Sequence, residues 1–226
     1  MMRTRALALL ASLALLACSG AAPEEGPSDP AAGYACDGAG ARFATGVTHY
    51  EFGTGQSFGQ DHFPEAVLGP PNGGGCCAGS LDVTSLGDGG FVVLEFEHNV
   101  IIDEAGPDFL VFENPFQGSE STPETVFAEL ATVSVSQDGE TWFDYPCTAD
   151  AYPFGACAGW HPVYANSKNN EIDPLSPEVA GGDAFDLADV GLEWARYVRI
   201  TDRPEADGGE GTFDLDAAAI VNPGCP

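Results

Sequence analysis

Residues 131–145 read ATVSVSQDGETWFDY, and this stretch decides the fold class. Val133 and Val135 alternate with threonine and serine, which is the two-residue period of a strand with one apolar face. Asp138 and Gly139 follow, and both residue types tolerate the positive φ angles of a hairpin turn. The residues after the turn return to a β-rich pattern. The stretch therefore predicts a β-hairpin.

Short apolar runs recur on both sides of this hairpin, separated by turns rich in glycine and proline. No segment shows a sustained helical period, although residues 185–191 could form one helical turn. Lysine, which surface helices usually carry in number, occurs once. We expect an all-β domain, a sandwich of short strands, with further strands at residues 47–52, 91–96, 108–113, 195–202 and 213–221.

Three segments resemble galactose-binding-like domains. Residues 135–142 (VSQDGETW) and 195–200 (ARYVRI) resemble a hairpin and a strand of discoidin-like (F5/8 type C-like) domains, and residues 66–73 (AVLGPPNG) resemble a loop of galactose-binding-like jelly rolls. Residues 106–114 and 181–191 resemble uncharacterised bacterial cell-surface proteins built on this kind of domain. The resemblance implies a jelly-roll β-sandwich that often binds glycans and often carries structural calcium. It does not identify the ligand.

The N-terminus predicts export and lipidation. Arg3 and Arg5 form a positive region, and the apolar run after them is too short to span a bilayer. The sequence LLAC then resembles the lipobox of bacterial lipoproteins, in which the cysteine, here Cys18, receives diacylglycerol and becomes the new N-terminus. An ordinary cleaved signal peptide is the alternative. We expect a lipoprotein signal peptide at residues 1–17, the lipidated cysteine with a flexible linker at residues 18–33, and the β-sandwich at residues 34–226.

The chain is strongly acidic, with a formal net charge of -28. Such a chain repels nucleic acid and anionic lipid headgroups and attracts cations. Ser19, directly after the expected lipid site, resembles the sorting signal that sends enteric lipoproteins to the outer membrane. We therefore expect a lipid anchor at the outer membrane or cell surface, a glycan or surface protein as partner, and no nucleic acid.

Six cysteines remain if one carries lipid, and an even number in an exported chain implies disulfides. The short spacing of Cys147 and Cys157 makes them a plausible pair, and the first and last of the six could join the domain ends. The adjacent residues Cys76 and Cys77 would then be bonded to each other, unless the pairing differs altogether. The sequence contains no CxxC motif, so it does not favour a zinc site. The six are Cys36, Cys76, Cys77, Cys147, Cys157 and Cys225.

Acidic residues gather in three groups that could bind calcium, which takes six to eight oxygen ligands from flexible loops. The alternative is that these residues form turns and cap them through their side chains. The first group also contains Asp103 and Glu104. The two aspartates of the third group share one face of a strand. The candidate ligands are Asp108, Glu113 and Asn114 in the first group, Asp183, Asp186 and Asp189 in the second, and Asp214 and Asp216 in the third.

Aromatic residues suggest a second kind of site. Trp160 and His161 lie in a long loop-like insertion with Tyr152 and Tyr164, and aromatic rings there could stack on sugar rings. The alternative is a loop held down by its own aromatics and by a disulfide. Trp142 follows the hairpin turn, and we expect it in the core.

No residue pattern compels an enzymatic function. The sequence shows no serine nucleophile elbow that leads from a strand into a helix, because the GxSxG pattern at residues 55–59 is followed by no helical period. It also shows no histidine with an evident nucleophile partner and no phosphate-binding glycine loop before a helix. Carboxylate pairs are expected by chance among 35 acidic residues, so they do not identify a glycosidase. We expect a non-catalytic binding module. The alternatives are a structural or adhesion lipoprotein with no small-molecule site, and a hydrolase.

Overall fold

The structure is a computed structural model, and it describes residues 41–225 apart from residues 57, 98, 149 and 205–210. The predictions for the signal peptide, Cys18, the linker and Cys36 fall outside the described residues. The described residues form an all-β domain whose helices are all short 3-10 turns. In this part of the chain, no helix is long and apolar enough to cross a bilayer.

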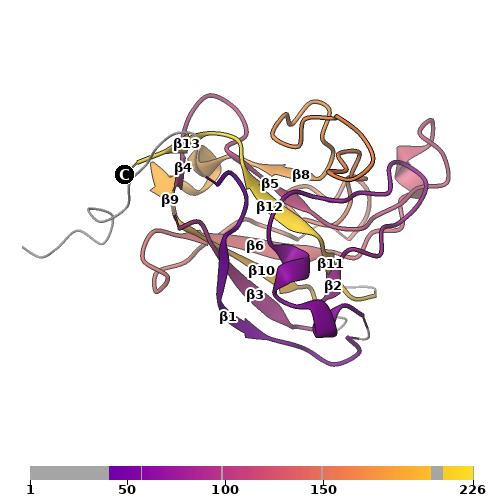
Figure 1. The fold of residues 1–226 in the computed structure, drawn as a ribbon, viewed down its shortest axis with the longest axis horizontal. Helices are drawn as coiled ribbons and strands as arrows, with labels where there is room; N and C mark the ends of the chain where they lie inside the picture. Colours follow the sequence, from indigo (N-terminus) through magenta and orange to yellow (C-terminus); the bar gives the residue numbers. More distant parts are fainter. Residues whose placement is uncertain (1–40, 57, 98, 149, 205–210, 226) are drawn as a thin grey trace, which may run out of the picture.

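The largest sheet has five antiparallel strands in the order β1-β3-β10-β6-β7. A three-stranded sheet, β12-β5-β8, faces it across the main core (Figure 1). The strands are β1 (Gly46–Glu51), β3 (Phe91–Glu95), β10 (Tyr197–Asp202), β6 (Ala131–Ser136), β7 (Phe143–Asp144), β12 (Ala217–Ile220), β5 (Phe109–Phe112) and β8 (Asp183–Phe185).

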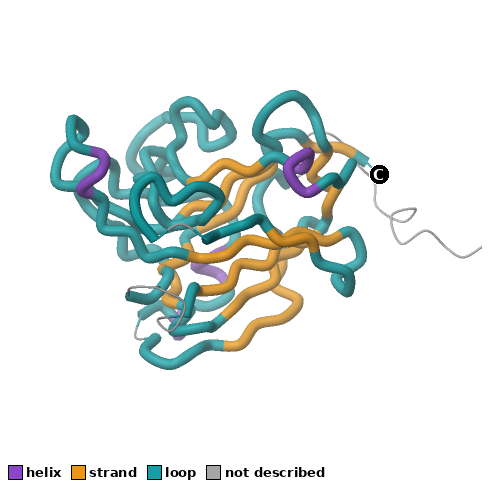
Figure 2. Tube along the Cα trace, turned by 180° about the vertical axis from the view of Figure 1, so that it is seen from behind, coloured by secondary structure: helices purple, strands orange, loops and turns teal. Residues whose placement is uncertain are grey.

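Two smaller sheets close the ends of the domain, in the orders β13-β4-β9 and β11-β2. Loops cover much of the remaining surface (Figure 2). The strands are β13 (Pro223–Gly224), β4 (Val100–Ile102), β9 (Trp194–Ala195), β11 (Asp214–Leu215) and β2 (Thr84–Ser85). The 3-10 turns are η1 (Gln60–His62), η2 (Glu65–Val67), η3 (Pro123–Thr125) and η4 (Leu187–Val190), the last being the expected helical turn.

Strand β5 is buried on both faces, which places it at the centre of the molecule. Phe109 and Val111 belong to the main core between the two large sheets. Leu110 and Phe112 belong to a second cluster with Val163 of the long loop after β7. This loop therefore lies on the outer face of the three-stranded sheet and is packed there by apolar contacts (Figure 1, orange, upper right).

The hairpin predicted at residues 131–145 is confirmed, with Val135 of β6 opposite Phe143 of β7. Of the two turn residues, only Gly139 has a positive φ, and the Asp138 carboxylate instead accepts the backbone N–H groups of residues 140 and 141. These two hydrogen bonds lower the pKa of Asp138 to about 2. The expectation that Trp142 lies in the core is wrong, because its half-buried ring stacks under the Arg199 guanidinium at 4.5 Å.

The disulfide predicted between Cys147 and Cys157 is confirmed. Cys76 and Cys77 are bonded to each other, which was one of the two outcomes left open by the sequence. Cys225 is also disulfide-bonded. Its predicted partner, Cys36, lies outside the described residues, so this pairing stays a prediction.

Candidate functional site

Four ring side chains gather on the long loop around Trp160. Its ring centroid lies 5.7 Å from that of Tyr152, 6.1 Å from that of Phe154 and 3.6 Å from that of His161. The indole N–H donates to the carbonyl oxygen of Cys157 at 2.9 Å, so the disulfide and the tryptophan fix the same turn. Three of the four predicted ligand-binding residues therefore lie together.

Asp183, the first residue of β8, holds this loop in place. Its buried carboxylate accepts the backbone N–H groups of Gly159 at 2.6 Å and Trp160 at 3.3 Å. Its other oxygen lies 2.8 Å from Nδ1 of His161. A side chain at position 159 would strike the Glu129 carbonyl oxygen at 2.0 Å, and φ is +95° there, so the tight turn requires glycine. The calcium-ligand prediction for Asp183 stays untested, but its oxygens serve the loop in this structure.

A hollow of about 430 Å³ opens beside this cluster, and we call it the Tyr164 groove. His161 and Tyr164 line it together with three polar side chains that the sequence did not single out, Gln117, Glu120 and Glu178. Burial and the nearby Glu120 carboxylate raise the pKa of Tyr164, which places these two side chains close together. Tyr152 and Trp160 are not among the described residues that line the groove.

A second hollow, of about 420 Å³, is also lined by Tyr164. We call it the asparagine hollow, because Asn72, Asn166, Asn169 and Asn170 line it along with the glycine loop at residues 73–75. Three of these amides already donate to backbone carbonyl groups: Asn166 to Gly73 and Asn170 to Tyr164, both at 2.9 Å, and Asn72 to Pro70 at 3.4 Å. The sequence signal was the density of asparagine between residues 166 and 170, which sequence reasoning missed.

A larger hollow of about 710 Å³ lies next to η1 and η2. Its apolar lining includes Phe58 and Leu81, and Leu81 is 81% exposed. It contains none of the predicted ligand or metal residues. Its lining also includes polar side chains, among them Gln60, His62 and Glu65, which could form hydrogen bonds with a ligand.

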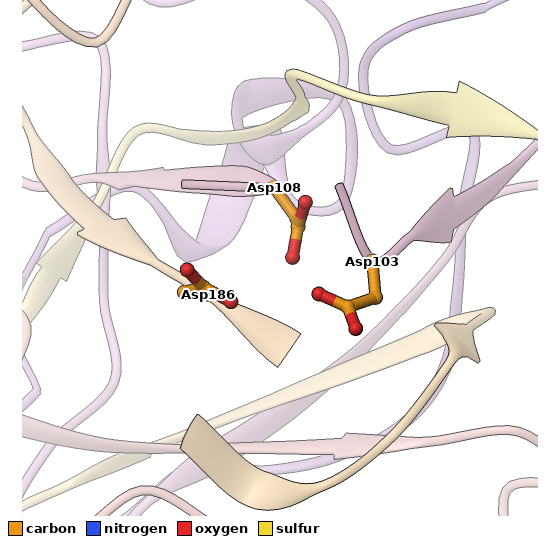
Figure 3. A group of neighbouring side chains, drawn as sticks. All are labelled: Asp103, Asp108 and Asp186. Atoms are coloured by element: carbon orange, nitrogen blue, oxygen red, sulfur yellow. The ribbon is translucent and has the colours of Figure 1, made fainter. Parts of the chain in front are cut away.

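The predicted calcium ligands divide among separate surroundings. Asp108 and Asp186 come together with Asp103, and one oxygen from each lies within 4.8 Å of the others (Figure 3). This is the only such group in the described part of the chain. Burial, and then the Asp108 charge, raise the pKa of Asp103. The exposed Asp189 is not part of this group.

Both oxygens of Asp108 already accept hydrogen bonds from the protein. Oδ1 accepts from the Glu104 N–H at 3.0 Å and from Nδ2 of Asn222 at 2.9 Å. Oδ2 accepts from the Leu187 N–H at 2.8 Å. Asp186 in turn caps η4 by accepting the N–H of Ala188 at 2.8 Å. The carboxylates of Asp108 and Asp186 thus stabilise the local fold, and calcium binding by the trio stays a prediction.

The third acidic pair is divided between two environments. Asp214 lies beside Glu113 and Asn114, and its carboxylate accepts a hydrogen bond from the Ser85 hydroxyl. Asp216 is buried two residues further on, where it accepts the Asn72 N–H at 2.8 Å. The two aspartates therefore contact different segments of the chain, and calcium binding by either stays a prediction.

Comparison with known proteins finds no family model that matches the chain and no similar sequence among curated proteins.

Proposed function

We propose that this protein is an exported, lipid-anchored surface protein whose β-sandwich is a jelly roll of the galactose-binding-like kind, and that it binds glycan without catalysis. The observation that carries the proposal is that Tyr164 stands in the wall of two adjacent hollows. An aromatic residue shared by two hollows with hydrogen-bonding side chains suits a chain of sugars, which have one apolar face per ring and hydroxyl groups around it.

The polar lining favours a neutral or basic glycan. Amide groups of the asparagine hollow can both donate to and accept from hydroxyl groups. The Tyr164 groove adds two carboxylates, Glu120 and Glu178, and the whole chain carries -28. Uronic acids or sulfated sugars would meet like charge on this surface, which makes them the poorest ligands.

The same two carboxylates raise the question of glycoside hydrolysis, which uses a carboxylic acid with a raised pKa as its proton donor. The pKa of Glu178 is lowered instead, first by the Ser176 hydroxyl that donates to it at 2.9 Å. A carboxyl held in its ionised form is a hydrogen-bond acceptor for sugar hydroxyls. It is a poor general acid, and this supports binding over hydrolysis.

Replacing Tyr164 by alanine is expected to weaken binding of the preferred glycan by about tenfold or more, since one central aromatic contact is worth about 1.4 kcal/mol or more. A glycan array with the disulfide-bonded wild-type chain identifies the ligand, and isothermal titration calorimetry then compares the variants. Trp142→Ala is the matched control, because Trp142 is a partly exposed aromatic residue at the hairpin, beside Arg199. It should bind as the wild type does.

Two results would count against this site. An array on which the wild type binds no glycan would favour a structural or adhesion lipoprotein. Equal loss in both variants would mean that the substitutions act through the fold and not through the groove.

Replacing Cys18 by serine is expected to release the protein from the membrane, because the acyl groups would be its only attachment. Detergent phase partitioning of cell fractions measures this, with the wild type in the detergent phase and the variant in the aqueous phase. Cys225→Ser is the control, since Cys225 is disulfide-bonded and cannot carry the lipid. A variant that stays in the detergent phase would contradict lipidation at Cys18.

A further inference from the structure

The wall of the Tyr164 groove carries negative charge. Its carboxylates belong to Glu120 and Glu178, and no lysine or arginine of the described residues lines it. Glu120 is exposed, and no described residue donates a hydrogen bond to its carboxylate. The Ser176 hydroxyl donates to Glu178 at 2.9 Å, which holds that carboxylate in place. The described part of the wall therefore contains no basic side chain to balance these two charges.

A buried amide lines the same groove. Gln117 is only 5% exposed, and its backbone N–H donates to the carbonyl oxygen of Cys76 at 2.9 Å, which fixes the residue. No described residue forms a hydrogen bond with its side-chain amide. Buried polar side chains nearly always have a hydrogen-bond partner, so this amide indicates that the groove takes a polar occupant. The amide oxygen adds an acceptor to the two carboxylates.

His161 brings a further acceptor to the groove. Its Nδ1 lies 2.8 Å from the buried carboxylate of Asp183. An ionised carboxylate can only accept, so Nδ1 carries the hydrogen and Nε2 of the neutral ring is an acceptor. The ring centroid also lies 3.6 Å from that of Trp160, so the ring is held on a second side.

We infer that the Tyr164 groove binds the ammonium group of an amino sugar whose nitrogen is not acetylated. This inference rests on the proposed glycan binding and names the class of sugar. An ammonium group has three hydrogen-bond donors, no acceptor and a positive charge, which complement the two carboxylates and the Gln117 amide oxygen. An N-acetylated sugar has one N–H and no charge at this position, so it would displace water from the carboxylates without compensating them.

The two hollows that share Tyr164 differ in the chemistry of their linings. The asparagine hollow offers amides, which both donate and accept, as the hydroxyl groups of a sugar do. The Tyr164 groove offers carboxylates, which only accept. An oligosaccharide would therefore place its amino sugar in the groove and the hydroxyl groups of a neighbouring sugar in the asparagine hollow.

The test compares three tetrasaccharides that share the β-1,4 linkage and consist of glucosamine, N-acetylglucosamine or glucose. Each is titrated into the mature, disulfide-bonded chain by calorimetry at neutral pH and about 0.15 M salt, where distant surface charges are largely screened. The glucosamine oligomer should bind at least about tenfold more tightly than the other two, because only it forms charged hydrogen bonds with the groove.

Three variants locate the ammonium site. Glu120→Gln should weaken binding of the glucosamine oligomer by about fivefold, because it removes one of the two charges that line the groove. Glu124→Gln is the matched control: it changes the net charge equally, and Glu124 is exposed and nearby but does not line the groove. Gln117→Met should also weaken binding, yet melt no lower than the wild type, because no described hydrogen bond of the side chain is lost.

The inference is overturned, with glycan binding intact, if a neutral or acetylated oligomer binds as tightly as the glucosamine oligomer. Equal weakening in Glu120→Gln and Glu124→Gln also overturns it, since the amine would then respond to the overall charge of the chain. If the wild type binds no glycan on the array, the proposed function fails and the inference fails with it. Glu120 is exposed, so its variant decides even if Gln117→Met does not fold.

Discussion

Asp108→Asn is expected to lower the free energy of unfolding by about 3 kcal/mol or more, because hydrogen bonds to a charged group are worth about 1.5–3 kcal/mol each. The wild-type carboxylate is 0% exposed and accepts three hydrogen bonds from Glu104, Leu187 and Asn222. Asparagine has a single oxygen, and its amide nitrogen would face an N–H donor on the other side. At least one buried donor would be left without an acceptor.

The cost is large because Asp108 connects three distant parts of the chain. Its side chain joins the loop after β4 to the start of η4 and to Asn222 near the C-terminus. Its backbone oxygen also accepts the N–H groups of Val221 at 2.8 Å and Asn222 at 3.2 Å. Loss of the Asp108 hydrogen bonds is therefore expected to weaken the pairing of β5 with both β8 and β12.

Urea unfolding followed by tryptophan fluorescence measures this change, with Asp189→Asn as the control. Asp189 lies in the same acidic region and is exposed, so its substitution should alter the free energy of unfolding by no more than about 0.5 kcal/mol. A cost below about 1 kcal/mol for Asp108→Asn would show that the three donors find water or other acceptors.

The elements that the sequence predicted are those whose pattern is local. Alternation in β6 and β10 and the Asp-Gly turn each act within a few residues, so the hairpin and both strands appear where expected. Strands β4 and β8 carry no such alternation. Their pairing depends on partners far along the chain, with β4 beside β9 and β8 beside β5.

The candidate site likewise has a part that the sequence predicted and a part that it did not. The loop around Trp160 was visible as a run of aromatic residues between two cysteines, and the structure brings three of its four candidates together. The Tyr164 groove was not visible, because Gln117 and Glu120 reach it from a segment more than 40 residues earlier. Sequence spacing also did not reveal the neighbours of the acidic residues, since Asp214 and Asp216 lie two residues apart and accept hydrogen bonds from different segments.

Trp142 shows why local reasoning placed a residue wrongly. A large apolar side chain after a hairpin turn is usually buried, and burial of an aromatic ring is favourable. In this fold Trp142 directly precedes β7, the edge strand of the five-stranded sheet, and its ring is only half-buried. The Arg199 guanidinium covers it instead, at 4.5 Å.

The protein is expected to lose stability as pH rises from about 5 to 9 in EDTA, and Asp216→Asn should remove much of this loss. Burial is the largest cause that raises the pKa of Asp216, and the Asp82 charge adds to it. The Asn72 N–H and Lys168 lower the pKa only in part, which leaves it at about 8. The usual value of about 3.9 applies in the unfolded chain.

The sign follows from the direction of this shift. The folded state holds the proton more tightly than the unfolded state, so the contribution to stability is complete below the unfolded pKa. It is lost as pH rises through about 8, the folded pKa of Asp216. For a shift of this size the loss is on the order of 4 kcal/mol, and an asparagine at this position, which does not titrate, would not suffer it.

The measurement is the free energy of unfolding in urea at pH 5, 7 and 9 for the wild type and Asp216→Asn. The two should be similar at pH 5, where the wild-type carboxyl is protonated, and the variant should be more stable at pH 9. The difference between the curves isolates Asp216, because Glu129 and Asp202, whose pKa values are also raised to about 7, are present in both proteins. Parallel curves would mean that Asp216 is ionised in the folded state throughout this range, with Lys168 or water compensating its charge.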